Sequence, residues 1–99
     1  MDQKLLTIDQ TKAKRPNLFQ VLLLNDDYTT MEFVVEVLRR FFGKSSNEAH
    51  ALMLRIHIDG EAVCGVYSHD VAQTKVSQVI DFSRKNDHPL MCIIREVRA

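Results

Sequence analysis

The chain has 99 residues, of which 45% are hydrophobic and 26% are charged. This length allows one small domain with a single core. The 13 basic residues balance the 13 acidic ones, so the chain lacks the broad positive field that supports non-specific nucleic-acid binding. No apolar run approaches the ~18 residues of a membrane span, and the first residues lack the apolar stretch of a signal peptide. We therefore expect a cytoplasmic, monomeric globular protein that binds neither nucleic acid nor membranes.

Residues 1–16 are predicted to form a flexible N-terminal extension. Their charged residues are scattered without helical or strand periodicity, and Pro16 ends the segment. The folded domain is expected to cover residues 17–99.

The first two elements are predicted to be a strand and a helix. Residues 18–24 (LFQVLLL) form a short, nearly continuous apolar run, which is typical of a buried strand. Thr29 and Glu32 then match the T-x-x-E capping box, and apolar residues recur at helical spacing as far as Gly43.

A second helix and a second strand follow. Ser45 and Glu48 form another capping box, and the Asp59-Gly60 pair is a turn signal that ends the helix. Residues 62–67 (AVCGVY) predict a strand with apolar or small residues on both faces, so we expect both faces to be covered.

The last helix and strand complete the order β-α-α-β-α-β. Ser68 is positioned to cap a third helix, with Asp70 in its first turn, and residues 86–89 (NDHP) break it. Residues 90–97 (LMCIIREV) predict the final strand. This order favours an α+β fold with a three-stranded sheet packed against three helices. The order of the strands within the sheet does not follow from the sequence.

The most unusual local feature is Asn25-Asp26-Asp27 directly after the first strand. Polar groups at the end of a strand often carry function, but the same residues commonly form an Asx turn. Two acids in this place also suggest the Mg²⁺ site of a phosphoreceiver enzyme. That alternative needs parallel strands and a phosphoacceptor aspartate at the end of another strand.

The sequence gives only weak signals for a metal site, a catalytic nucleophile or a disulfide. His50, Met53 and His57 share one flank of the second helix, and Cys64 and Cys92 lie on predicted strands. None of these residues shows the short spacing of a zinc site, and neither thiol is paired with a base. Two cysteines are also too few for a disulfide framework. Spacing alone therefore predicts a small binding module without metal, cofactor or enzymatic activity.

Four stretches of the chain closely resemble the ClpS family, the adaptors of the bacterial N-end rule pathway. The matching stretches are VLLLNDDYTTMEFVVEVLRRFF (21–42), EAHALMLRIH (48–57), AVCGVYSHDVAQTKV (62–76) and HPLMCII (88–94). The chain departs from the family at Thr30, where proline is common, and at Asp70 and Gln73, where glutamate is common.

The resemblance implies an adaptor that binds substrates through a free N-terminal residue with a large hydrophobic side chain (Leu, Phe, Tyr or Trp). Such a residue is an N-degron. The matching positions for its α-amino group are Asn25, Asp26 and His57, provided that the end of the first strand meets the end of the second helix. The matching positions for its side chain are Leu23, Thr29, Met31, Val34, Met53, Ile56 and Leu90.

The resemblance also implies delivery of substrates to the ClpA unfoldase of the ClpAP protease. Asp70 and Lys75 match the surface that docks on the N-terminal domain of ClpA, and residues 1–16 match the extension that the unfoldase engages. An alternative is a stand-alone module of another degradation system, similar to the ClpS-like module of N-end rule ligases.

Overall fold

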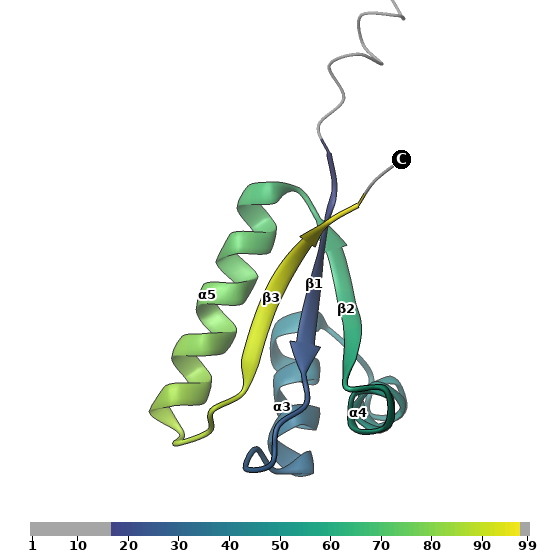
Figure 1. Cartoon of the computed structure of the whole chain (residues 1–99), viewed down its shortest axis with the longest axis vertical. Helices are drawn as coiled ribbons and strands as arrows, with labels where there is room; N and C mark the ends of the chain where they lie inside the picture. Colours follow the sequence, from purple (N-terminus) through teal and green to yellow (C-terminus); the bar gives the residue numbers. More distant parts are fainter. Residues whose placement is uncertain (1–16, 98–99) are drawn as a thin grey trace, which may run out of the picture.

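The computed structural model describes residues 17–97, so the predicted N-terminal extension lies outside the described residues. The elements in chain order are β1 (Phe19–Leu24), α3 (Met31–Phe42), α4 (Ser46–Asp59), β2 (Glu61–Tyr67), α5 (His69–Lys85) and β3 (Met91–Glu96) (Figure 1). The predicted α+β class and the order β-α-α-β-α-β are confirmed.

Helix α3 begins one residue later than the sequence pattern predicted. The N-cap is Thr30, whose hydroxyl accepts a hydrogen bond from the backbone N–H of Phe33 at 3.1 Å. The predicted capping box of Thr29 and Glu32 is wrong, because the Thr29 hydroxyl donates to Asp26 instead. The threonine that replaces the family's common proline thus supplies the cap itself.

Helix α4 has the capping box that the sequence predicted. The Ser45 hydroxyl accepts from the N–H of Glu48, and the Glu48 carboxylate accepts from the N–H of Ser45. Gly60 ends the helix with a φ of 91°, and its N–H donates to the carbonyl of Ile56 at 2.9 Å. A residue with a side chain would be strained in this left-handed conformation.

The sheet is antiparallel, with the strand order β2-β1-β3. It therefore lacks the parallel strands that a phosphoreceiver domain requires. The register between β1 and β2 shifts between Val21 and Leu22, which leaves Cys64 as a bulge. Gly65 follows the bulge, where the Tyr67 ring fills the space that a side chain at this position would need.

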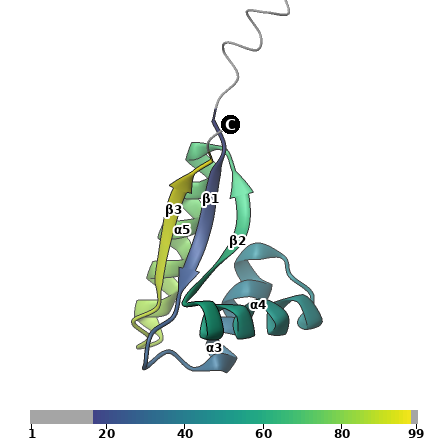
Figure 2. The same cartoon turned by 45° about the vertical axis from the view of Figure 1, so that its right-hand side comes forward.

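The core lies on one face of this sheet. Helix α5 packs against β1 and β3, while α3 and α4 contact β2 (Figure 2). The side chains of Val21 and Leu23 point into this core, and those of Val37, Leu38 and Val79 meet them from the helices.

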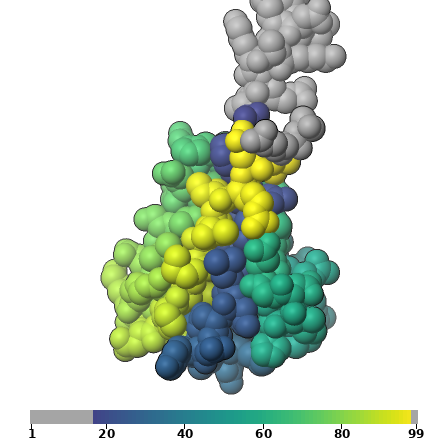
Figure 3. Space-filling model, in the orientation of Figure 1, coloured from purple at the N-terminus to yellow at the C-terminus, as the bar shows by residue number. Residues whose placement is uncertain are grey.

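Among residues 17–97 no helix packs on the opposite face of the sheet (Figure 1), and atoms of the strands form the molecular surface there (Figure 3). The prediction that residues 62–67 are covered on both faces is therefore wrong, because Val63 and Val66 are exposed. Leu22 faces the same side but is only 1% exposed. Arg95 and Glu61 explain its burial, since their ion pair at 2.9 Å joins β3 to β2 across β1.

Candidate functional site

The end of β1 meets the end of α4. The backbone N–H of Asn25 donates to the carbonyl of Gly60 at 2.9 Å, which places Asn25 beside the last turn of α4 that contains His57. The condition set by the sequence analysis for joining these two residues is met.

A cavity of about 250 Å³ opens at this junction. It combines a polar end from the β1–α3 loop with an apolar wall from α3 and α4. The residues that line it are Asn25, Asp26, Asp27, Thr29, Met31, Val34, Met53, Ile56 and His57. Asp27 belongs to the polar triplet that the sequence singled out, but the resemblance assigned only Asn25 and Asp26 of that triplet to the amino group.

Asp26 is the most constrained group at the polar end. Its Oδ1 accepts hydrogen bonds from the backbone N–H groups of Tyr28 at 2.8 Å and Thr29 at 2.7 Å, and its Oδ2 accepts from the Thr29 hydroxyl at 2.7 Å. This is the Asx turn that the sequence left open as one alternative. An ionised carboxylate has about four acceptor sites, so about one remains for a ligand.

The same contacts keep Asp26 ionised. Partial burial raises the pKa of its carboxyl, but the hydrogen bonds from Thr29 and Tyr28 outweigh that effect, and the nearby His88 adds to them. The net result is a pKa below the ordinary aspartate value. The polar end therefore carries a fixed negative charge at neutral pH.

The apolar wall is formed mainly by buried side chains. Val34, Met53 and Ile56 are buried and come from two different helices, whereas Met31 at the start of α3 is 46% exposed. Met31 therefore lies at the rim, where a flexible, polarizable thioether can adapt to a ligand.

Two of the seven predicted pocket residues do not reach the cavity surface. Leu23 and Leu90 are fully buried in the core, and neither lines the cavity. Only the resemblance to the family placed them in the pocket, whereas their apolar side chains on or beside core strands are equally typical of the core in which they lie.

The remaining candidate residues lie apart from this cavity. His50 contacts the carbonyl of Ser46 through Nδ1 at 2.8 Å and lines a neighbouring cavity. Cys64 and Cys92 are buried on strands that flank β1, which separates them by ~10 Å, too far for a disulfide. Burial raises the pKa of each thiol to about 12.

Within residues 17–97 no three potential metal-ligating side chains are grouped together. No helix in the same part of the chain is both long and apolar enough to cross a membrane.

Asp70 and Lys75 line a shallow surface on α5, but only one of them is free there. The Asp70 side chain is fully exposed, and its Oδ1 lies 3.7 Å from Nδ1 of His69. Lys75 donates to the carbonyl of Phe41 at 2.7 Å and lies 5.7 Å from the centre of the Tyr67 ring. Its ammonium therefore ties α5 to the last turn of α3.

Residues 14–93 match the family model described as ATP-dependent Clp protease adaptor protein ClpS. The chain belongs to the ClpS family of Clp protease adaptors. The ClpS adapter protein of Roseobacter denitrificans is 54% identical over 95 residues, which cover 96% of this chain and 84% of that protein. The ClpS adapter of Alkalilimnicola ehrlichii is 58% identical over 85 residues, which cover 86% of this chain and 80% of that protein.

A solved structure of the ClpS family has the same fold. Agrobacterium tumefaciens ClpS2 bound to L-phenylalaninamide superposes with a TM-score of 0.81 and 38% sequence identity. The match covers 84% of this chain and 100% of that one. The resemblance that the sequence motifs indicated is confirmed by the family model, the relatives and the fold.

Proposed function

We propose that this protein is a non-catalytic adaptor that binds the free N-terminal residue of a substrate protein and delivers the substrate to ClpA. The observation that carries the proposal is the single cavity with a fixed carboxylate at one end and buried apolar side chains at the other. An N-terminal Leu, Phe, Tyr or Trp has the matching pair of groups on one carbon atom.

The polar end suits an α-ammonium group. An α-amino group has a pKa near ~8 and is mostly protonated at pH 7, so it presents three donors. Asp26 has about one acceptor site left, and the Asn25 amide oxygen and an unprotonated ring nitrogen of His57 would each offer one more. Three donors thus meet three acceptors, and an acetylated amine would leave acceptors without a partner.

The apolar wall suits a large hydrophobic side chain. Burying a Leu or Phe side chain contributes ~1.5–3 kcal/mol, to which charge-assisted hydrogen bonds add ~1.5–3 kcal/mol each. The ligand of the Agrobacterium relative, L-phenylalaninamide, combines a free α-amino group with an aromatic side chain. That chemistry is the one proposed for this cavity.

A series of peptides that differ only in their first residue tests the binding step. Fluorescence anisotropy should detect micromolar or tighter binding for Leu, Phe, Tyr and Trp, and at least ~10-fold weaker binding for Ala, Ser and Glu. Equal affinity across the series would contradict a pocket that recognises the first side chain.

Delivery to ClpA is proposed to use Asp70 with Lys75, and the N-terminal extension. Exposed Asp70 is available to a partner, while Lys75 positions α5 against α3. Asp70→Ala should weaken binding to the ClpA N-terminal domain but leave peptide affinity unchanged, and Asp81→Ala on the same helix serves as the control. Deleting residues 1–14 should leave peptide affinity unchanged but slow ClpAP degradation; degradation at the full rate would exclude a delivery role.

A further inference from the structure

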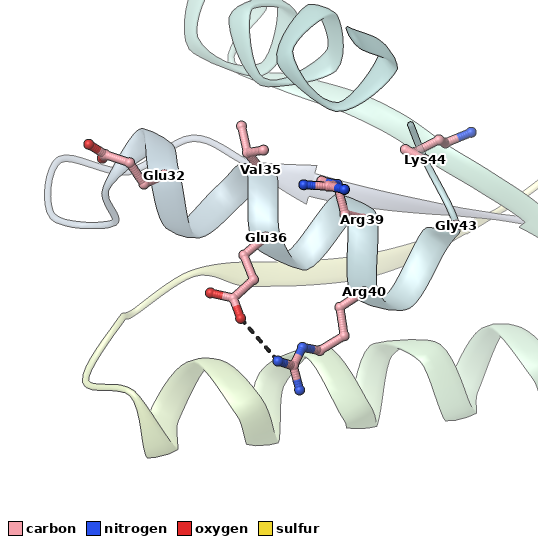
Figure 4. Close-up of a pocket in the computed structure, with 7 residues that line it drawn as sticks. All are labelled: Glu32, Val35, Glu36, Arg39, Arg40, Gly43 and Lys44. Carbon is pink, nitrogen blue, oxygen red and sulfur yellow. Dashed lines mark hydrogen bonds and ion pairs between the residues drawn. The ribbon is translucent and has the colours of Figure 1, made fainter. Parts of the chain in front are cut away.

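The candidate cavity continues along α3. A second cavity of about 390 Å³ shares Met31 and Met53 with it and is bounded by His50 on α4. A third, of about 540 Å³, shares Glu32 and Val35 with the second and extends to Lys44 (Figure 4). We refer to the second and third cavities together as the α3 groove.

Charge changes along the α3 groove from acidic to basic. Glu32 lies at the end next to the candidate site, and Arg39 and Lys44 lie at the far end. Among residues 17–97, neither Arg39 nor Lys44 has a side-chain hydrogen bond or an ion-pair partner. Both are drawn on the same side of α3 as Val35 (Figure 4).

Arg40 differs from these two cations although it lines the same cavity. It pairs with Glu36 at 3.1 Å and lies over the Phe82 ring at 4.6 Å, on the other side of α3. Within the described part of the chain, Arg39 and Lys44 therefore have no internal ion pair, whereas Arg40 has internal partners. The Lys44 charge does help to lower the pKa of the nearby Glu48 carboxyl, so Arg39 is the less compensated of the two cations.

We infer that the substrate chain runs from the candidate site along the α3 groove, and that an acidic side chain about four to six residues from its N-terminus binds Arg39 and Lys44. This inference rests on the proposed function, which places the first residue next to Met31. Arg39 lies eight residues after Met31 in α3, or ~12 Å along the helix. An extended peptide covers that distance in three to four residues at ~3.4 Å each.

Two observations favour the substrate chain as the occupant of the α3 groove: the groove adjoins the candidate cavity, and its far end is positively charged. The groove shares two side chains with the candidate cavity, so a chain whose first residue fills that cavity has an adjoining path. Carboxylates complement the free cations at the far end, whereas a carboxylate near the start would lie beside Glu32.

Two peptides that begin with phenylalanine and differ only at the fifth position, glutamate against glutamine, test this inference. At low ionic strength the glutamate peptide should bind about twofold to fivefold more tightly, and at ~0.5 M salt the difference should disappear. Moving the glutamate to the second position should remove the gain, because Asp26, Asp27 and Glu32 make that end of the path acidic.

Two variants test which cations cause the difference in affinity between the two peptides. The double variant Arg39→Gln, Lys44→Gln should bind both peptides equally, while Arg55→Gln, which removes an exposed cation of α4, should keep the difference. A glutamate peptide that gains nothing, or gains equally in the double variant, would overturn the inference and leave the proposed function intact. Failure of the glutamine peptide to bind at all would overturn the proposed function itself.

Discussion

The hydroxyl of Thr29 donates a hydrogen bond to Oδ2 of Asp26 at 2.7 Å, and the backbone N–H of Thr29 donates to Oδ1 of the same carboxylate at 2.7 Å. Both oxygens are thereby held in one orientation before a ligand arrives. A carboxylate that is already oriented loses little freedom on binding, which favours affinity.

The charge of Asp26 is expected to matter more than that of its neighbour Asp27. Asp26→Asn keeps an oxygen that can accept the backbone N–H bonds of the turn but removes the charge that binds the ammonium group. Affinity for a phenylalanine peptide should fall ~10- to 150-fold, which corresponds to one charged hydrogen bond of ~1.5–3 kcal/mol. Asp27→Asn removes an equal charge from the same cavity and should cause a clearly smaller loss of affinity. Equal losses would indicate that Asp26 only stabilises the turn and does not bind the ammonium group.

Met31 is expected to exclude substrates that begin with Ile or Val. The Thr30 cap fixes its backbone at the start of α3, and its side chain lies at the rim of the cavity, where we expect it to lie close to the Cβ atom of a bound residue. β-Branched side chains have few rotamers with which to avoid such a wall. Met31→Ala should raise the affinity for an Ile peptide relative to a Leu peptide by ~1–3 kcal/mol, or about 5- to 150-fold.

The ratio of the two affinities is the quantity to measure, because Met31→Ala also removes apolar surface and can weaken both peptides. A ratio that does not rise would mean that Met31 does not exclude β-branched side chains.

Binding should weaken as the pH falls from 7.5 to 5.5. Protonation of an imidazole turns its acceptor nitrogen into a donor that carries a positive charge, and His57 in that form would repel the ammonium group. The carboxyl of Asp26, with its lowered pKa, stays ionised throughout. One proton is displaced per ligand, so affinity should change no more steeply than about tenfold per pH unit.

His57→Gln retains an acceptor oxygen that does not titrate, so its pH profile should be flat. His69→Gln, on α5 and outside both the candidate cavity and the α3 groove, leaves His57 in place and should behave like the unmodified protein. A flat profile in the unmodified protein would show that His57 does not accept from the amine.

The ion pair on the open sheet face should make stability depend on pH. The hydrogen bond from Arg95 lowers the pKa of the Glu61 carboxyl, so the folded state binds this proton less readily than the unfolded state. The resulting stabilisation is present above the ordinary glutamate pKa of ~4.3 and is lost as the pH falls through the folded value.

Glu61→Gln should therefore lower the free energy of unfolding near pH 7 and leave it nearly unchanged near pH 3. Urea denaturation at the two pH values measures the difference. In an Arg95→Gln background the same substitution should have little effect at either pH; a persistent effect there would show that Glu61 acts through another partner.

The local pattern predicted the cap of α4 correctly, whereas Ser68 stands at the N-cap of α5 without a side-chain hydrogen bond. Ser45 and Glu48 form their capping box because both partners lie within one turn. At the start of α3 two adjacent threonines both fit the pattern, and Asp26 decides between them by taking the hydroxyl of Thr29.

Features that depend on contacts between residues far apart in the chain could not be predicted from the sequence. The position of β1 between β2 and β3 and the ion pair that covers Leu22 follow from strand pairing over long separations. The joining of Asn25 and His57 in one cavity also needs the hydrogen bond from β1 to Gly60. Family motifs supplied these two residues, whereas spacing alone offered them no common role.

Calorimetric titration with L-phenylalaninamide and with its N-acetylated derivative tests the central claim most directly. The two ligands share the same side chain and differ at the amine that Asn25, Asp26 and His57 are proposed to bind. We predict that L-phenylalaninamide binds and that the acetylated compound is at least ~100-fold weaker, because it loses the charge and leaves acceptors without a partner. Equal affinities for the two compounds would contradict recognition of the free amino group.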